Sequence, residues 1–346
     1  MLFHIMKSRD IRQNLATEYY LMNEKDYDQP VLLFYIQEPC VILGRNQSVY
    51  EEVNINKLKE KNIVLSRRVS GGGAVYDDLG NLSFSYILNK EDKTFGQYAT
   101  ILEPIVKAIK KLGVSDIRVD GRNDMMIGQK KISGNAMYTK GDKMFSHGTL
   151  LFDVDLEVLP DLLTVSKEKL ASKGVKSVKS RVTNIKPYLG SEHQEMTTEM
   201  FRDYLVGELM GTTDPDCLSH QEIHLTAEDE ACIATLMATT YSNDAWIYGA
   251  SPEFTLKRRR YFDGIGTVQA EWSVVEGKLS AISLRGDFFG QKPVSELEEK
   301  LQGLSLYSPD VLAELDSLSL SLYVSGLQSE QLLALLTEVR ENNDSM

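Results

Sequence analysis

The residues of this sequence that could carry chemistry lie in four short stretches, the first of which is Arg67–Tyr76, reading RRVSGGGAVY. Three consecutive glycines leave backbone N–H groups unshielded and permit positive φ, so this loop could wrap an anion. Arg68 could add charge-assisted hydrogen bonds to that anion. The stretch matches neither the Walker A loop nor the GxGxxG fingerprint that opens a helix. A glycine triplet is also typical of a flexible hairpin loop, and this alternative stays open.

The second stretch runs from Asp120 to Gly134 and places Lys131 between two glycines. A lysine near a phosphate loop could stabilise negative charge as it develops during a reaction. Asp124 could hold that lysine or a Mg²⁺ ion. The alternative for this stretch is a solvated basic turn.

The third stretch, Ser146–Phe152, places His147 at the start of an apolar strand, where a packed, hydrogen-bonded histidine is the alternative to a functional one. The fourth is the basic run from Lys167 to Lys186. Such a run is usually a solvated helix face, but in an acidic chain it could also attract pyrophosphate or an acidic protein partner.

Composition excludes several classes of protein. The chain has 346 residues and a formal net charge of −12, so we expect no nucleic-acid partner. No apolar run approaches the length of a membrane span and no signal peptide is evident, so a cytoplasmic location is expected. Cys217, near His220 and His224, is the one conceivable nucleophile pair, and no third group supports it.

Apolar spacing predicts the elements that must position these stretches. We expect strands over 31–36 and 40–43 that neighbour each other, further strands at 63–69 and 82–88, short strands through 117–152 broken at Gly121, Gly128, Gly134 and Gly141, and helices at 11–22, 95–112, 157–173 and 198–210. The expected fold class is mixed α/β (α+β), without the regular alternation of a doubly wound sheet.

The character of the chain changes beyond a turn-rich stretch at 211–222 and a helix opened by a capping box at Thr226. A hairpin is expected over 268–285, followed by helices opening at Ser295 and at Ser308-Pro309. We therefore expect two domains, residues 1–247 and a smaller α+β domain over 252–346.

Taken together, the motifs resemble the bacterial lipoate–protein ligase A family. The resemblance rests on RRVSGGGAVYDDLGNLSFS (67–85), GRNDMMIGQKKISGNAMY (121–138), HGTLLFDVDL (147–156) and KLASKGVKSVKSRVTNI (169–185). It implies a biotin/lipoate ligase-like mixed-sheet catalytic domain with a small C-terminal domain that reorients after adenylate forms. Asp77 stands where this family usually has histidine, which weakens any role assigned at that position.

The resemblance also implies the chemistry: ATP, with Mg²⁺, activates lipoic acid as lipoyl-AMP, and the lipoyl group passes to a lysine of an acceptor domain. Lys131 would be catalytic, touching the lipoate carbonyl oxygen and the α-phosphate, and Asp124 would contact Mg²⁺. The adenylate would be held by Arg68, Gly71, Gly72, Gly73, Ala74, Val75 and Tyr76, with Asp124 nearby. Lipoate would meet Lys131, Arg68, Gly73 and His147, and Leu43, Val75, Phe84 and Ile132 would help line its apolar tunnel.

The implied partners are apo lipoyl domains, either glycine cleavage protein H or the E2 subunit of a 2-oxoacid dehydrogenase, and the implied state is a monomer. Three alternatives stay open at this point. The nearest is an ATP-independent octanoyl or lipoyl transferase of the same superfold. The others are a biotin ligase and a non-catalytic lipoate- or nucleotide-binding module.

Overall fold

The structure is a computed structural model that describes residues 1–89, 95–121, 123–163, 181–248, 256–275, 278–306 and 308–337. The chain divides into two compact units. The larger unit comprises Met1–Arg45, Val49–Ser70 and Ala74–Gly249, and the smaller comprises Asn46–Ser48, Gly71–Gly73 and Ala250–Met346.

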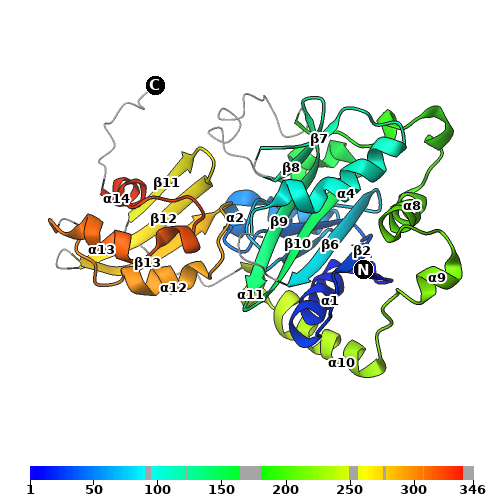
Figure 1. Ribbon diagram of the computed structural model, residues 1–346. Helices are drawn as coiled ribbons and strands as arrows, with labels where there is room; N and C mark the ends of the chain where they lie inside the picture. The colour runs from blue at the N-terminus through cyan, green and yellow to red at the C-terminus, as the bar shows by residue number, and fades with distance from the viewer. Residues whose placement is uncertain are drawn as a thin grey trace. The chain divides into compact units, whose positions relative to one another are not determined.

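Two sheets organise the larger unit (Figure 1). In spatial order, the main sheet has strands β1 (Leu2–Ile5), β2 (Val31–Tyr35), β6 (Asn81–Asn89), β10 (Lys143–Leu151), β9 (Lys130–Lys140), β8 (Asp124–Ile127) and β7 (Ile117–Asp120). Only the β1–β2 pair is parallel. In the second sheet, β3 (Cys40–Leu43) pairs parallel with β4 (Val64–Arg67) and antiparallel with β5 (Val75–Asp77).

The helices of this unit are α1 (Ile11–Glu24), α2 (Val49–Glu52), α3 (Ile55–Glu60), α4 (Tyr98–Lys111), α5 (Leu159–Leu162), α8 (Thr198–Met210), α9 (Pro215–Ser219), α10 (Ala227–Leu236) and α11 (Asp244–Tyr248). Short 3₁₀ turns lie at Leu156–Val158, Lys186–Tyr188 and Ser191–His193, and a π-helical turn at Met237–Tyr241 extends α10.

Strand β2 shows how the helices cover both faces of the main sheet. Its side chains alternate, as they must in a strand. Leu32 and Phe34 pack in one buried cluster with α4 and α8. Val31, Leu33 and Tyr35 pack in another with α1 and α10. Because both faces are covered, β2 is an unbroken apolar run, fully buried from end to end.

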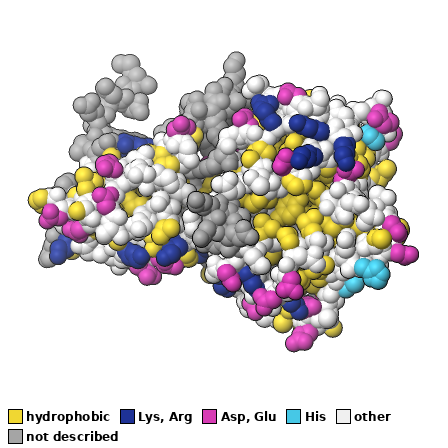
Figure 2. All heavy atoms as spheres, viewed as in Figure 1, with side chains coloured by type: hydrophobic (Ala, Val, Ile, Leu, Met, Phe, Trp, Pro, Cys, Tyr) yellow, Lys and Arg dark blue, Asp and Glu magenta, His cyan; other side chains and the backbone are white. Residues whose placement is uncertain are grey.

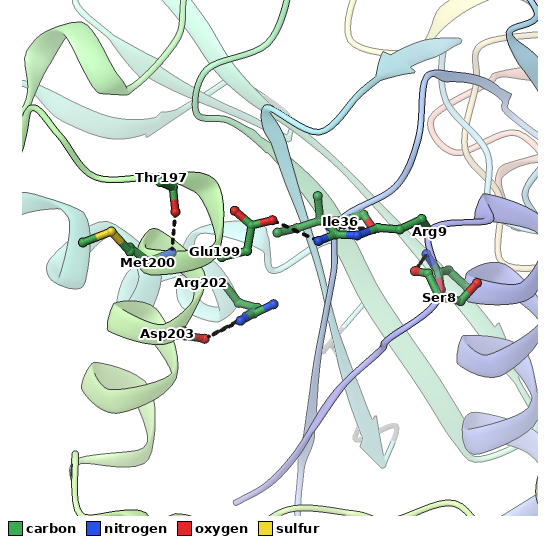
Figure 3. A network of polar contacts seen from close by, with 9 residues as sticks. Ser8, Arg9, Ile36, Thr197, Glu199, Met200, Arg202 and Asp203 are labelled. Carbon is green, nitrogen blue, oxygen red and sulfur yellow. Dashed lines mark hydrogen bonds and ion pairs between the residues drawn. The ribbon is translucent and has the colours of Figure 1, made fainter.

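Caps fix where the long helices begin and end. The Asp10 side chain accepts from the backbone N–H of Arg12 at the start of α1, and Gly113, with φ of 96°, follows the end of α4. Thr197 caps α8 by accepting from the N–H of Met200 (Figure 3). In the same view, Arg9 donates to Glu199 at 2.9 Å, which ties the loop before α1 to the start of α8.

The smaller unit folds around a three-stranded antiparallel sheet. Its order is β11 (Leu256–Phe262), β12 (Gly266–Val275) and β13 (Lys278–Gly286), and its helices are α12 (Val294–Leu301), α13 (Val311–Ser317) and α14 (Ser329–Thr337), with a 3₁₀ turn at Leu320–Leu322. Trp272 is buried at the centre of its core. The Arg258 guanidinium lies 5.5 Å from the centroid of this ring and also donates to the carbonyl of Leu335.

The sequence predictions failed where pairing is non-local. β2 and β3 follow each other in the chain but belong to different sheets, so the prediction that they are neighbours was wrong. A continuous apolar run specifies burial and not a partner, and β3 instead pairs with β4 and β5. Gly134 does not end a strand, because β9 runs through it. Strands β1 and β11 were not predicted at all.

Helix boundaries also differ from the sequence predictions at several points. The turn-rich stretch 211–222 contains the short helix α9. The helix expected at Ser295 follows Pro293 instead, and Glu298 within it accepts from the N–H of Leu284 on β13 at 2.6 Å. The helix expected at Ser308 begins at Val311. The capping box at Thr226 is confirmed.

One face of the molecule is shown in Figure 2, where Lys and Arg side chains gather over α4. The outward face of that helix carries the exposed Lys107, Lys110 and Lys111, while its inner stripe is apolar. Within the described ranges, no helix has both the length and the apolar character that crossing a membrane requires.

Candidate active site

Lys131 lies near one end of β9 and points at a carboxylate on the neighbouring strand. Its Nζ lies 2.8 Å from Oδ1 of Asp124, the first residue of β8, and both side chains are largely shielded from water. A bulge makes this pairing possible. Asp124 is opposite Gly134, but Met126 is opposite Lys131, so the register shifts by one residue between Met125 and Met126.

Gly134 provides the space in which the Lys131 side chain lies. A Cβ placed on Gly134 would come within 2.7 Å of Nζ of Lys131 and 3.1 Å of its Cε. The backbone at Gly134 does not have positive φ, so no turn requires the glycine. The glycine is needed because any side chain here would displace the lysine.

A segment distant in sequence completes the surroundings of the lysine. Val182 forms a parallel β-bridge with Lys131, and the Thr183 N–H donates to the Lys131 carbonyl at 2.9 Å. Arg181 donates to Oδ2 of Asp124 at 2.6 Å. Asp124 is thus shared by two cations, which matches the prediction that it could hold the lysine.

Of the Lys and Arg residues in the predicted basic run, the described ranges contain only Arg181 and Lys186. Lys186 pairs with Asp153 at 2.7 Å. The lysines between Lys167 and Lys179 lie outside the described residues, as does most of the helix expected at 157–173. The described part of that expected helix is only the short α5, Leu159–Leu162.

The two arginines that precede the glycine loop have different partners. Arg67 is buried, and its guanidinium donates to the backbone carbonyls of Ile247 and Gly44. Trp246 in α11 donates in turn to the Arg67 carbonyl at 2.8 Å, so this arginine joins α11 to β4. Arg68 points into a buried polar network instead. We therefore assign Arg67 a structural role and keep Arg68 as a candidate site residue.

A chain of buried hydrogen bonds runs from Arg68 to the first helix. Nε of Arg68 donates to Oγ of Ser70 at 3.0 Å, and that oxygen lies 2.7 Å from Nε2 of His147. Nδ1 of His147 lies 3.0 Å from Oε1 of Glu18. Because Arg68 can only donate, the Ser70 hydroxyl is free to donate to His147, and the second ring nitrogen then donates to Glu18.

His147 is therefore buried, and both of its ring nitrogens are hydrogen-bonded. These contacts also agree with the alternative that His147 is a packed structural residue. Glu18 and Ser70 were missed by sequence reasoning. A signal for Glu18 was present, because it falls on the apolar side of α1, between Leu15 and Met22 at helical spacing. A carboxylate at such a position needs a buried partner.

Replacing Glu18 tests this chain of hydrogen bonds. Glu18→Ala leaves the Nδ1 proton of His147 without an acceptor, and a buried unsatisfied group costs roughly 1–3 kcal/mol. Glu18→Gln keeps an acceptor oxygen and should lose much less. We expect urea unfolding at pH 7 to rank the free energies of unfolding as wild type, Glu18→Gln, then Glu18→Ala. Equal losses in both variants would contradict the proposed donor and acceptor order.

Asp77, the residue that departs from the family pattern, is fully buried beside Arg68. Its Oδ2 accepts from Nε2 of Gln37 at 2.7 Å, and Ser83 lies next to the same amide. Burial raises the pKa of Asp77 to about 7, although the Gln37 hydrogen bond and the charge of Arg68 oppose the shift. Burial likewise lowers the pKa of Arg68 to about 10, with Asp77 opposing.

This shift makes stability depend on pH. The unfolded chain loses the Asp77 proton near pH 3.8, while the folded protein keeps it to about pH 7. The free energy of unfolding should therefore fall as pH rises across that window. Asp77→Asn cannot ionise, so we expect it to exceed wild-type stability at pH 8 by roughly 2–4 kcal/mol and to match it near pH 4. If the free energies of unfolding of wild type and Asp77→Asn, measured with denaturant, change with pH in parallel, the raised pKa of Asp77 is contradicted.

The other predicted site residues lie in several places. Ala74, Val75 and Tyr76 belong to the larger unit, with Val75 and Tyr76 in β5. Gly71, Gly72 and Gly73 group with the smaller unit, where the Gly72 N–H donates to the carbonyl of Phe288 and Gly72 has a φ of 96°.

The residues expected to line a lipoate tunnel do not share one apolar cluster. Phe84 and Ile132 pack with α4, Val75 packs beside the cluster of α1, and Leu43 packs with α5. Cys217 is exposed in α9, and its thiol donates to Asp214 rather than to a histidine.

The described residues do not form an evident resident site for Mg²⁺. They contain no group of three His, Cys, Asp or Glu side chains that could hold a metal ion. Both oxygens of Asp124 are already engaged, by Lys131 and by Arg181. Mg²⁺ is usually held by one or two carboxylates together with substrate phosphates, so this carboxylate is a poor fit for a metal bound by protein alone.

A mixed sheet with helices on both faces, a lysine held near one end of its inner strand β9 and a smaller α+β unit together define the class of protein. The family description "Lipoyl protein ligase A/B catalytic domain" matches residues 10–210, and "Bacterial lipoate protein ligase C-terminus" matches residues 251–336. The chain belongs to the lipoate–protein ligase family, and it is an enzyme, a lipoate–protein ligase.

Similar proteins agree with this assignment. The chain is 39% identical to lipoate-protein ligase LplJ of Bacillus subtilis, covering 94% of this chain and 97% of that protein. It is 37% identical to lipoate–protein ligase 1 of Staphylococcus aureus, covering 94% and 96%. A crystal structure of lipoate-protein ligase A bound with ATP matches with a TM-score of 0.58 and 27% identity, over 72% of this chain and 99% of that one.

A further solved structure describes a bipartite lipoate protein ligase and its E2 lipoyl domain from Thermoplasma acidophilum. It matches with a TM-score of 0.62 and 28% identity, over 74% of this chain and 98% of that chain. The predicted fold class, a ligase-like mixed sheet with a smaller C-terminal domain, is confirmed by these likenesses and by the three-stranded sheet of the smaller unit.

Proposed function

We propose that this ligase activates lipoate with ATP through Lys131 and then passes the lipoyl group to the lysine of an acceptor lipoyl domain. The observation that carries the assignment of Lys131 is its position. The ammonium is held by one carboxylate, in a space that Gly134 leaves free, on a strand of the main sheet. A cation held beside the reacting groups can stabilise negative charge as it develops during the reaction.

In the proposed first step, a lipoate carboxylate oxygen attacks the α-phosphorus of ATP and pyrophosphate leaves. Charge grows on the bridging and non-bridging oxygens around that phosphorus, and Lys131 would lie against them and against the lipoate carbonyl. Positioning and electrostatic stabilisation account for most catalysis of such transfers. Mg²⁺ would enter with the phosphates of ATP and offset part of their charge.

The glycine triplet and the residues on either side of it would bind the adenylate. Arg68 would contribute its charge near the lipoate carboxylate and phosphates. Ser70, His147 and Glu18 would orient the Arg68 guanidinium through their series of hydrogen bonds. The backbone of Gly71, Gly72 and Gly73 and of Ala74–Tyr76 would hold the nucleotide. These roles follow from the family resemblance and from the buried position of the Arg68 network.

In the proposed second step, the ε-amine of the acceptor lysine attacks the activated carbonyl, the amide forms, and AMP leaves. The E2 lipoyl domain that accompanies the Thermoplasma ligase supports an E2 domain as the acceptor class here. Glycine cleavage protein H is the other candidate acceptor. We propose that the enzyme works as a monomer in the cytoplasm.

Isotope exchange tests this function directly. Reversible adenylate formation requires that labelled pyrophosphate enter ATP only when lipoate is present. We expect lipoate-dependent exchange by the wild-type protein without any acceptor, and transfer to an apo E2 lipoyl domain when one is added. Acyl transfer to the acceptor without ATP, and no exchange, would favour the octanoyl or lipoyl transferase instead. Neither activity in folded protein would favour the non-catalytic binding module.

A further inference from the structure

We propose that Arg181 is a positioning residue for the ligase reaction, because it binds the carboxylate that presents the ammonium of Lys131. This inference rests on the proposed role of Lys131. Arg181 would act through Asp124 and need not touch the substrate itself. Two side chains from the paired strands β8 and β9 and one from a distant segment would then work as one unit.

Asp124 offers one carboxylate oxygen to each of these two cations. Oδ1 lies 2.8 Å from Nζ of Lys131, and Oδ2 lies 2.6 Å from a guanidinium nitrogen of Arg181. The three side chains are each about a quarter exposed or less, at 23% for Lys131, 17% for Asp124 and 25% for Arg181. Ion pairs shielded to this degree are screened less by water than those on an open surface.

Backbone contacts keep Arg181 in register with the lysine. The next residue, Val182, bridges Lys131 in parallel, and the Thr183 N–H donates to the Lys131 carbonyl. Any displacement of Arg181 along the strand would break that backbone hydrogen bond. The backbone that follows Arg181 is therefore held beside Lys131 by one bridge and one hydrogen bond.

The charges suggest what this arrangement does during a reaction. An anionic ligand would draw the Lys131 ammonium away from Asp124. Without Arg181, that movement would leave the shielded carboxylate without either of these two cations, and the cost would oppose binding of the ligand. With Arg181 on Oδ2, Asp124 keeps a partner while the lysine moves. Arg181 therefore lowers the cost of releasing Lys131 to the substrate.

Removing the arginine should slow adenylation by strengthening the hold of Asp124 on Lys131. We expect Arg181→Gln to reduce the turnover number of lipoate-dependent pyrophosphate exchange by about tenfold, which corresponds to roughly 1.4 kcal/mol of the activation barrier. Arg181→Lys restores a cation opposite Oδ2 and should recover much of the rate. Lys186→Gln is the matched control, because it removes a cation of the same segment that pairs with Asp153 instead.

A double-mutant cycle separates this role from two others. If Arg181 acts through Asp124, Arg181→Gln should cause no further loss of turnover in an Asp124→Asn background. Full additivity, or a rise confined to the KM for ATP, would show direct contact with the nucleotide and overturn the proposal. The melting temperatures of the variants should stay near that of wild type. A rate loss that parallels a loss of melting temperature in every variant, without rescue by Arg181→Lys, would show that Arg181 is only structural and would also overturn the proposal.

The proposed function can fail separately from this inference. If Lys131→Ala abolishes exchange while Arg181→Gln leaves it at the wild-type rate, Lys131 keeps its role and the inference about Arg181 is wrong. If Lys131→Ala retains exchange, the assignment of Lys131 itself is wrong.

Discussion

Lys131→Ala is expected to reduce lipoate-dependent exchange of pyrophosphate into ATP by about 10²–10³-fold, the usual effect of removing one preorganised charge contact in a transition state. The loss should appear mainly in the turnover number, because the ammonium would stabilise charge that grows only as the phosphorus–oxygen bonds change. Transfer of lipoate to an apo lipoyl domain should fall by a similar factor. The measurement is steady-state exchange at saturating ATP and lipoate.

The neighbouring lysine provides the control for that experiment. Lys130 is exposed and begins the same strand, so Lys130→Ala removes the same charge from the same part of the chain. It should keep close to wild-type activity. A loss below tenfold in folded Lys131→Ala, or an equal loss in both variants, would show that general electrostatics and not a held ammonium drives the rate.

Gly134→Ala is expected to cost nearly as much activity without altering any charge. The added Cβ would lie 2.7 Å from Nζ of Lys131, closer than Cβ contacts are found, and 3.1 Å from Cε, which is a tight contact. The backbone accepts alanine, and the end of a lysine side chain moves easily, so the strand should survive and the ammonium should shift. A displacement of about 1 Å at a reacting group can cost on the order of 10²-fold in rate.

Two measurements decide how the Gly134→Ala result is understood. The midpoint of urea unfolding should stay near that of wild type, because the clash is relieved by a flexible side chain. Exchange at saturating substrates should fall, while the KM for lipoate changes less. Wild-type exchange in this variant would mean that the position of Lys131 beside Gly134 has no effect on the reaction.

Much of this site could be predicted from sequence because its signals are local. The glycine triplet, Lys131 between glycines and the helix from residue 95 to 112 are each recognisable from neighbouring residues. The long amphipathic stripe of α4 and the alternation of β6 match the structure closely. Family resemblance then supplied a function that composition and periodicity could not.

Other parts depend on contacts between distant residues, which a single sequence does not reveal. Glu18 lies 129 residues from His147, and Arg181 lies 57 residues from Asp124. Neither partner can be identified from spacing. Strands β2 and β3 illustrate the same limit in the fold, because their apolar runs are alike and only long-range pairing places them in different sheets.

The bridge between Lys131 and Val182 also has a consequence for measuring motion in this enzyme. The Thr183 amide proton is held by the Lys131 carbonyl, so it can exchange with solvent deuterium only when the segment separates from the strand. The exchange rate of this amide therefore reports how often strand β9 separates from the segment that carries Thr183. Comparing that rate with and without lipoate and ATP would reveal whether substrates slow the separation, at a single amide and without any substitution.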